Sequence, residues 1–486
     1  MKKIILLILP LAIIACQNNN NTVSEKSPLE SIVKKFTDSS KNARDGMPID
    51  ILMVELEQDS SGLELPALQS PAIATYKGLW ILIGGRKSGV HSMDNDPPSF
   101  NKLANNDTIW VINIAEKKKV GIKVPAQYWN YLSATNPLYT QDSSFLYLAG
   151  GYTVSDSTRK RNNWSSDMFF QISLPNLVNY VLSGGQSPSL NQVFTKVIQS
   201  PYVKLSGGEM AVAGSYFYLI GGQTYDTTYE QGVNGLYSNS IRKFRLANTV
   251  NGWTLTDTAS LIDPVNLHRR DFNMADVILD DGSLGEVIYG GVFTPDDMAY
   301  RNPVYITGLS TGNPVISVDT SMKQVANLYT GAKINAYLGG STIRFNHITF
   351  LGGISLLQYD TTTQKLVYPP VGQELPFSNL ISSYITDGRT QSAETVQLPP
   401  YPMMPGYLGT NAIFFPDPSL TVNGFPFNID LNRVFDKYQN KRIPIGYFYG
   451  GIKSPVPTLI TPGQNYLSTV NRNLYRVYMK LAVPVH

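Results

Sequence analysis

The sequence is poor in cysteine and in charge. Cys16 is the only cysteine among 486 residues, so no disulfide within the chain is available to hold a fold together. Charged residues make up 15%, and removal of residues 1–15, which include Lys2 and Lys3, lowers the 39 basic side chains to 37 against 36 acidic ones. Nucleic-acid binding needs a concentrated basic surface, so we expect no nucleic-acid partner.

Signatures of catalysis and of metal binding are also missing. The chain has no Walker A loop, dinucleotide-binding glycine fingerprint, zincin motif or nucleophile elbow. Its histidines and acidic loops lack the spacing of zinc or calcium ligands, so we expect no metal and no cofactor, and a binding protein rather than an enzyme. These residues are His91, His268, His347 and His486, Asp94 to Asp96, and Asp296-Asp297.

The N-terminus has the pattern of an exported protein. A basic start at Lys2-Lys3 precedes an almost wholly apolar run over residues 4–14, which is typical of a secretory signal and too short to span a bilayer comfortably. The run ends in Ile13-Ile14-Ala15-Cys16, which resembles the bacterial lipobox. The resemblance implies acylation of Cys16 and attachment to a membrane through its lipid; the alternative is a plain signal peptide with a chance cysteine.

The segment after Cys16 has the composition of a tether. Residues 17–22 are nearly all asparagine and do not order themselves, whereas Ser27, Pro28 and Glu30 favour a short helix. Gln17 stands where an aspartate would retain a Gram-negative lipoprotein in the inner membrane, which favours the outer membrane of the cell envelope, facing the periplasm or the surface. The expected parts are a signal peptide (1–15), a lipidated tether (16–47) and a folded body (48–486).

An apolar, aromatic-rich run that ends in Gly-Gly occurs six times. The runs are continuous rather than alternating, which indicates strands buried on both faces, and the glycines permit positive φ in a crowded place. Their first glycines stand 62 to 98 residues apart, which indicates a repeat fold. The runs cover residues 79–85, 145–151, 216–222, 286–291, 348–353 and 446–451.

Further strands follow from comparing the six units. Tight turns at Lys77-Gly78 and Asn346-His347 should precede the Gly-Gly strands, and the insertions 354–378 and 417–442 should be loops. Segment 51–56, with 63–65, should close the last unit beside 473–482, because open sheet edges are avoided. The other expected strands are 337–345 and 407–415 (innermost), 107–114 and 240–246 (third) and 252–256 (fourth).

These units resemble kelch repeats, and more loosely the galactose-oxidase type of propeller. The resemblance covers residues 48–486 and implies an all-β, six-bladed kelch-like β-propeller of four-stranded antiparallel blades. The units are longer than the roughly 50 residues of a kelch repeat, and the family tryptophan after the third strand is clear only as Trp253. Galactose oxidase needs a cysteine cross-linked to its copper-ligand tyrosine, so its chemistry is excluded in a chain with Cys16 alone.

The resemblance also places candidate binding residues at one end of the channel, the Gly-Gly mouth. Arginine suits a carboxylate, and tyrosine suits a sugar face or a peptide; the alternative is that the arginines form ion pairs that brace adjacent blades. Residues that follow the Gly-Gly pairs are Arg86, Tyr152, Gln223, Val292, Ile354 and Ile452. The other candidates are Tyr225, Glu209, Arg269 and Arg270.

The sequence leaves three functions open. The first is a membrane-anchored module that binds a protein or glycan at the Gly-Gly mouth. The second is an isomerase of the sialic-acid mutarotase type, in which Arg86 or Arg270 would hold the carboxylate of a sugar acid and Glu209 would act in proton transfer. The third is a structural component of a cell-envelope complex. Fold alone does not choose among them.

Overall fold

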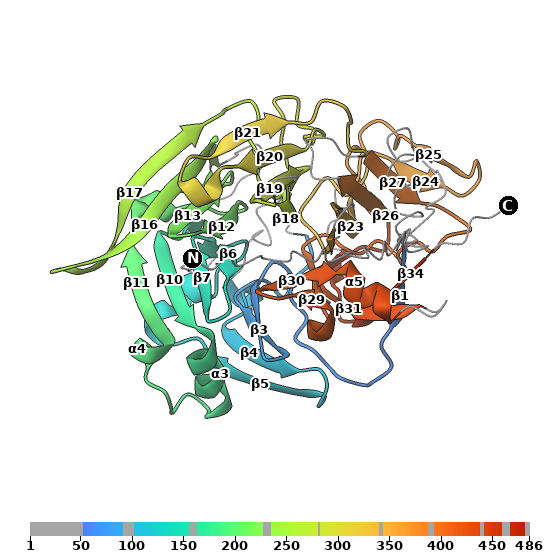
Figure 1. Cartoon of the computed structure of the whole chain (residues 1–486). Helices are drawn as coiled ribbons and strands as arrows, with labels where there is room; N and C mark the ends of the chain where they lie inside the picture. Colours follow the sequence, from blue (N-terminus) through green and yellow to red (C-terminus); the bar gives the residue numbers. More distant parts are fainter. Residues whose placement is uncertain are drawn as a thin grey trace, which may run out of the picture.

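The computed structural model describes residues 52–90, 102–154, 163–226, 235–279, 282–339, 344–386, 393–437, 442–458 and 467–481. The predicted signal peptide, the lipidated cysteine and the tether lie outside these residues. Within them, six sheets stand around a central axis (Figure 1). The chain is a six-bladed β-propeller, which confirms the predicted all-β architecture. None of the helices in the described part of the chain combines the length and apolar composition of a membrane span.

Each blade has four antiparallel strands that follow one another from the axis outward. Blade one is β2 (Ala72–Tyr76), β3 (Leu79–Ile83), β4 (Thr108–Asn113) and β5 (Lys118–Lys123); blade two is β6 (Leu138–Gln141), β7 (Phe145–Ala149), β10 (Met168–Ser173) and β11 (Phe194–Gln199). Blade three is β12 (Glu209–Ala213), β13 (Tyr216–Ile220), β16 (Ser240–Thr249) and β17 (Gly252–Ile262). Blade four is β18 (Asn273–Ile278), β19 (Leu284–Tyr289), β20 (Val304–Thr307) and β21 (Val315–Val318).

The last two blades include an added hairpin and the N-terminal strand. Blade five is β22 (Lys333–Gly339), β23 (Arg344–Ile354), β26 (Phe377–Thr386) and β27 (Ala393–Gln397). Blade six is β28 (Ala412–Pro416), β31 (Ile443–Gly450), β34 (Tyr475–Leu481) and β1 (Leu52–Gln58). The hairpin of β29 (Thr421–Val422) and β30 (Phe425–Asp430) joins blade five through parallel pairing of β30 with β22.

Short hairpins, helices and 3-10 turns lie in the connections between the blade strands. The hairpins are β8 (Tyr152–Val154) with β9 (Asn163–Ser165), β14 (Gln223–Thr224) with β15 (Leu236–Tyr237), β24 (Gln358–Asp360) with β25 (Lys365–Val367), and β32 (Ile452–Lys453) with β33 (Thr469–Val470). The α-helices are α2 (Trp129–Leu132), α3 (Leu174–Leu182), α4 (Leu190–Val193) and α5 (Leu431–Asp436). The 3-10 turns are η1 (Lys102–Ala104), η2 (Ala126–Tyr128), η3 (Pro201–Val203), η4 (Leu309–Thr311) and η5 (Pro418–Leu420).

The paired glycines join each blade to the next. In all six pairs, the N–H of the second glycine donates to a carbonyl just ahead of the next blade's innermost strand, at 2.8–2.9 Å. A Cβ on the first glycine would lie only 2.0–2.9 Å from that same oxygen. The repeated motif is therefore an inter-blade clamp that leaves no room for a side chain. The accepting carbonyls belong to Ala134, Leu205, Arg269, Leu328, Leu408 and Leu68.

The hydrophobic core is divided among the contacts between neighbouring blades. Between blades two and three, for example, Phe169, Phe217 and Phe244 are buried and their rings lie 5.3–5.6 Å apart. Each Gly-Gly strand is buried on both of its faces because it lies between two such clusters. This burial explains why the strands read as continuous apolar runs in the sequence.

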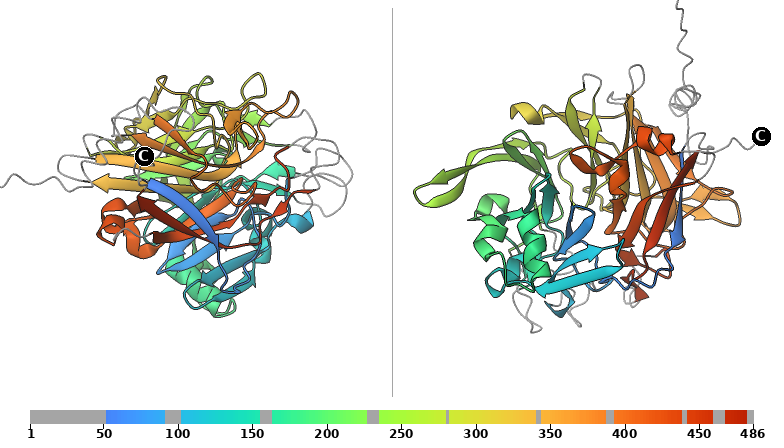
Figure 2. Two further views of the ribbon diagram at one scale, coloured as in Figure 1. Left: turned by 90° about the vertical axis from the view of Figure 1, so that its right-hand side faces the viewer. Right: turned by 60° about the horizontal axis from the view of Figure 1, so that its bottom comes forward.

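The ring closes through strands from opposite ends of the chain. β1 pairs antiparallel with β34, from Leu52 opposite Leu481 to Gln58 opposite Tyr475, and the two lie side by side in Figure 2. Arg442 also binds Glu55 at 2.6 Å. The N-terminal strand therefore occupies the expected outer position in blade six, while residues 63–65, the other strand expected there, form no strand.

The strand boundaries of blade five were predicted incorrectly. Asn346 and His347 do not form a turn but lie within β23, and the predicted innermost strand 337–345 spans the end of β22 and the start of β23. The polar pair is tolerated there because Asn346 hydrogen-bonds both the N–H and the C=O of Ile278 in blade four, at 2.9 Å each. The Asn346 side chain thus satisfies backbone groups of Ile278 that would otherwise need a partner strand. The predicted loops 354–378 and 417–442 contain hairpins and α5.

Candidate functional site: the central channel

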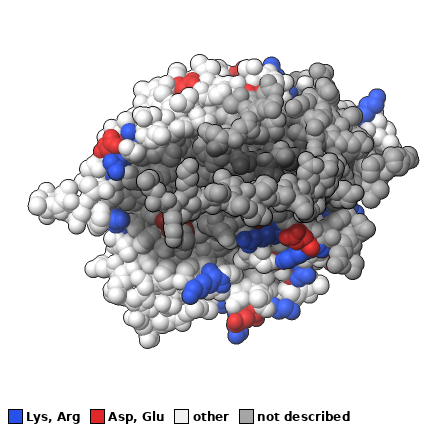
Figure 3. Space-filling view, viewed as in Figure 1, with Lys and Arg blue, Asp and Glu red and all other residues white. Residues whose placement is uncertain are grey.

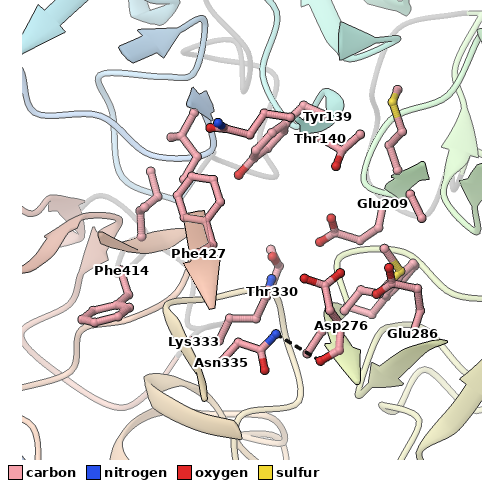
Figure 4. A pocket seen from close by; sticks show the side chains of 18 of the residues that line it. Tyr139, Thr140, Glu209, Asp276, Glu286, Thr330, Lys333, Asn335, Phe414 and Phe427 are labelled. Carbon is pink, nitrogen blue, oxygen red and sulfur yellow. Dashed lines mark hydrogen bonds between the residues drawn. The ribbon is translucent and has the colours of Figure 1, made fainter. Parts of the chain in front are cut away.

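The channel contains a cavity of about 390 Å³ on the propeller axis. Residues of the innermost strands of all six blades line it, and Gly424 to Asn428 of the β29–β30 hairpin line one end. β30 runs beside Asn335–Tyr337 in the later part of β22, so the hairpin lies away from the segments that lead into the innermost strands. The cavity is therefore built from every repeat of the fold (Figure 4).

The other end of the cavity is bounded by a closed ring of backbone hydrogen bonds. One residue from each blade, just ahead of its innermost strand, donates its N–H to the carbonyl of the equivalent residue in the preceding blade, at 2.7–3.3 Å. Five of the six have positive φ, between 49° and 67°, a conformation that Asn, Asp and Gly adopt most readily. These rim residues are Ser70, Asn136, Gly207, Asp271, Thr330 and Asn411. Their closed ring of hydrogen bonds sets the width of the opening at the Gly-Gly mouth.

The residues that follow the Gly-Gly pairs lie behind this rim. All six are buried: Arg86, Tyr152, Gln223, Val292, Ile354 and Ile452. The backbones of Arg86, Tyr152 and Gln223 form bridges with the residues just before the rim, and Val292 does so with Arg270. Among the predicted site residues in the described part of the chain, Glu209 alone lines the cavity.

The predicted tyrosines come together, and the predicted arginines bind neighbouring protein groups. The rings of Tyr152 and Tyr225 lie 5.2 Å apart, edge to face. Arg269 donates to the carbonyls of Gly290 and Asn302 and lies 4.4 Å from the ring of Tyr300. Burial lowers the pKa of Arg269, and likewise that of Arg86, to about 10, so both carry a charge at neutral pH.

Arg270 contacts the side chain of Asp271, a rim residue whose carboxylate also accepts from Asn136 at 3.0 Å. Burial lowers the pKa of Arg270, but Asp271 and the hydroxyls of Tyr329, Tyr237 and Tyr225 together outweigh it and raise that pKa well above its ordinary value. The pair connects blade four to the rim segment of blade two. The ion pair itself joins two successive residues, so it differs from the ion pair between adjacent blades that the alternative described.

Three carboxyl groups form one side of the cavity, and we call Glu209, Asp276 and Glu286 the acid wall (Figure 4). Burial, then the charge and hydrogen bond of Asp276, and then Glu209 raise the pKa of Glu286 well above its usual range, against the opposing effect of Lys333. Burial raises the pKa of Glu209 as well; Lys333 lowers it and Asp271 raises it. Glu286 therefore gives up its proton less readily than an exposed glutamate does.

The opposite side of the cavity is largely apolar. Phe414 of β28 and Phe427 of β30 lie there (Figure 4), with Ile73, Ile413 and Phe425 also in the lining. Asn335 is 7% exposed and donates to the carbonyl of Asp276 at 3.1 Å and to Asn428 at 3.0 Å. The cavity thus offers separate polar and apolar walls to one occupant.

Sequence analysis missed Asp276, Glu286 and Lys333. A usable signal was present, because each is a charged residue within a mostly apolar strand, with Asp276 and Lys333 on innermost strands and Glu286 on the second strand of blade four. Charged side chains are rarely buried unless a partner or a function keeps them there. Comparing the innermost strands position by position would have found Asp276 and Lys333, together with Glu209.

Similarity to known proteins does not assign the chain to a family. No protein-family model matches this chain, and no curated protein matches it. Membership of the kelch family therefore stays a prediction from the Gly-Gly motifs. The function is accordingly inferred from the geometry of the channel.

The described residues contain no candidate metal site. Among them, no group of three or more His, Cys, Asp or Glu side chains is placed to hold a metal ion. His91, Asp94 to Asp96 and His486 lie outside the described residues. In the view of Figure 3, the described lysine and arginine side chains occur in small groups along the periphery, several of them beside acidic ones.

Proposed function

We propose that this protein is a ligand-binding module of the cell envelope that holds a small polar ligand in its central channel. The observation that carries the proposal is the cavity of about 390 Å³ to which all six blades contribute. Ligand pockets commonly measure about 300–1,000 Å³ and combine apolar walls with a few converging polar groups. The acid wall with Lys333, set against the phenylalanine side, has this composition.

The ligand test is a thermal-shift screen of small metabolites and glycan fragments against the purified chain and a variant with a filled cavity. Thr140 lines the cavity and is half-buried, so Thr140→Trp should remove a stabilising ligand's effect. The matched control Thr258→Trp, on the exposed outer strand β17, should retain it. A ligand that stabilises both variants equally would place binding outside the channel.

Membrane attachment is the second part of the proposal, and it is supported by the lipobox-like sequence at Cys16. Acylation of that cysteine would leave the propeller outside the bilayer on its tether. Growth with an alkyne analogue of palmitate should label the native protein and leave Cys16→Ser unlabelled. Recovery of unlabelled native protein in the soluble fraction would contradict the anchor.

An isomerase that acts on a sugar acid is a second candidate, favoured by one observation. Glu209, whose pKa is raised by burial, lines the same cavity as Lys333, so a titrating carboxyl and a cation for a carboxylate occur together. Lys333 would take the place that the sequence suggested for Arg86 or Arg270. NMR exchange between the anomers of N-acetylneuraminate should then be faster than in buffer and should be lost in Glu209→Gln; an exchange rate equal to that of buffer excludes the activity.

A further inference from the structure

We infer that the channel ligand is an organic ammonium compound with a compact apolar body, its nitrogen held at the acid wall and its body against the apolar side of the cavity at Phe427. The inference rests on the proposed function and names the chemical class of its ligand. It follows from how the charges of the cavity are distributed and paired.

The acid wall is built into the propeller at the junction of blades three and four. Glu209 stands on β12, Asp276 on β18 and Glu286 on β19. Glu286 is only 8% exposed and lines the cavity. Its hydrogen-bonding partner is another carboxyl, that of Asp276. In the described part of the chain, no lysine or arginine forms an ion pair with any of the three.

Such an arrangement is unfavourable in the empty protein. Buried charges are normally paired, and two neighbouring carboxylates cannot both ionise cheaply, so one keeps its proton. A ligand ammonium placed among the three groups would supply the missing partner, with up to three charge-assisted hydrogen bonds from one nitrogen. The site is therefore complementary to a cation, since no lysine or arginine in the described part of the chain forms an ion pair with these carboxyls.

Lys333 limits where that cation can sit. It stands on β22 of blade five and lines the same cavity, and it lowers the pKa of both Glu209 and Glu286. It is close enough to weaken the field of the acid wall but forms no ion pair with it in the described part of the chain. The ammonium is expected on the side of Asp276 and Glu286, and removal of the Lys333 charge should strengthen binding.

The apolar wall selects the rest of the ligand. Phe414 and Phe427 come from β28 and β30 on the far side of the cavity from the acid wall (Figure 4). The ring of Phe427 offers apolar contact area, and aromatic faces also attract cations, while the ring of Phe414 packs in the core between blades five and six. A fully hydrophilic polyamine would leave this wall unused, whereas an arylalkyl or alkyl ammonium uses both sides.

Protons should leave the site when the cation binds. An ammonium favours ionised carboxyls and so lowers the raised pKa values of Glu209 and Glu286. Binding should therefore strengthen as pH rises from 5 towards 8, because fewer protons then need to be displaced. The titratable groups that line the cavity are Tyr139 on β6, Asp142 just after β6, Glu209, Asp271, Asp276, Glu286 and Lys333.

The test uses the full chain with Cys16→Ser, which removes its only thiol, and with Thr140→Cys as a reporter in the cavity. Two reagents of similar size modify this thiol: cationic 2-aminoethyl and anionic 2-sulfonatoethyl methanethiosulfonate. The probes are 2-phenylethylammonium and its anionic counterpart 3-phenylpropionate. Val315→Cys, on an outer strand and 58% exposed, is the reference thiol.

We expect 2-phenylethylammonium at millimolar concentration to slow the modification of Thr140→Cys and 3-phenylpropionate to leave it unchanged. The preference for the cationic reagent should exceed that at Val315→Cys by about tenfold, fall with Glu209→Gln and rise with Lys333→Met. Glu116→Gln, an exposed surface change, should have no effect.

Two results would overturn different claims. Protection by 3-phenylpropionate but not by 2-phenylethylammonium would show that the cavity binds an anion at Lys333. The ammonium inference would then be wrong, while the proposal of a ligand in the channel would remain. If Thr140→Cys reacts with neither reagent in the folded protein while Val315→Cys reacts with both, the channel is inaccessible and the proposed function falls with it.

Discussion

At the scale of single residues, the fold depends on backbone conformations that few side chains tolerate. The first glycine of each Gly-Gly pair has positive φ and approaches a carbonyl of the next blade. Two different costs would follow from a side chain at such a position: the strain of the left-handed conformation and the clash with that carbonyl. They can be separated, because other glycines share the conformation without the contact.

Gly150→Ala should destabilise the protein more than Gly184→Ala does. Their φ values are nearly equal, at 66° and 70°, but the new Cβ would lie 2.0 Å from the oxygen of Leu205 in the first case and would contact nothing within 4 Å in the second. Both variants lose about 1–2 kcal/mol to strain, and Gly150→Ala loses about 1–3 kcal/mol more. Urea unfolding measures the difference, and equal losses would show that the clamp has no energetic role.

His347 should make stability depend on pH. Burial lowers its pKa from 6.5 to about 4, so the folded state resists a proton that the unfolded state accepts. The stability present above pH 6.5 should fall as pH drops towards 4, by on the order of 3 kcal/mol. Below pH 4 the protonation of His347 causes no further loss of stability.

The comparison for His347 is His347→Gln, which cannot titrate. The raised carboxyl pKa values of Glu209 and Glu286 act in the opposite sense in both proteins, so the difference between the two pH profiles isolates the histidine. Between pH 6.5 and 4, the free energy of unfolding of the parent should fall by on the order of 3 kcal/mol relative to that of His347→Gln, as measured by chemical denaturation. Parallel profiles would mean that His347 takes up its proton in the folded state.

At the scale of elements, the segments just ahead of the innermost strands hold the blades together, and Arg270 with Asp271 is the clearest case. The side chain of Asp271 is 2% exposed and that of Arg270 is 11% exposed. Removal of one partner from a buried ion pair leaves the other charge uncompensated. The pair can therefore be examined as a structural unit apart from any ligand.

Arg270→Met should lower the free energy of unfolding by about 3–5 kcal/mol. Arg270→Met combined with Asp271→Asn should recover much of the loss, because no buried charge is then left alone. Both values come from urea titrations of the purified chain. Full stability in Arg270→Met, with loss of a binding partner, would instead favour the role at the Gly-Gly mouth that the sequence suggested.

The elements also show what the sequence could and could not predict. The Gly-Gly strands were found because burial on both faces produces a continuous apolar run. The predicted turn at Lys77-Gly78 is confirmed, with positive φ at both residues. The turn at Asn346-His347 was wrong because the polar groups of Asn346 are satisfied by the adjacent blade, which no local pattern reveals. Glu286 was missed because its partner Asp276 comes opposite it only through the pairing of β18 with β19, and because Glu209 and Lys333 reach the same cavity from other blades.

At the scale of the whole molecule, the propeller is a ring that depends on the pairing of β1 with β34. The chain direction permits a rearrangement of this pairing. β34 ends at Leu481 opposite Leu52, so a tight turn after β34 would lead directly into β1 in its native direction. The β1 segment could thus be moved to the C-terminal end of the chain and still occupy its place in blade six.

Deletion of residues 1–58 should prevent formation of a stable monomer, because it leaves β34 as an exposed edge strand. Attaching residues 52–58 after residue 481 through a short glycine-rich turn should restore it. Size-exclusion chromatography and thermal unfolding compare the two chains. A stable monomeric deletion variant would show that the ring does not require the pairing of β1 with β34.

The closure of blade six has a consequence for the order in which the protein is made. β1 is the first strand of the propeller to leave the ribosome, and its partner β34 is the last. Five blades can assemble as the chain emerges, at the ribosome or after export, but the sixth waits until β34 arrives, with β1 unpaired throughout. A chain that ends just before Tyr475 lacks β34, so β1 and β31 would each expose an unpaired strand edge. Both edges are covered only when β34 has been made.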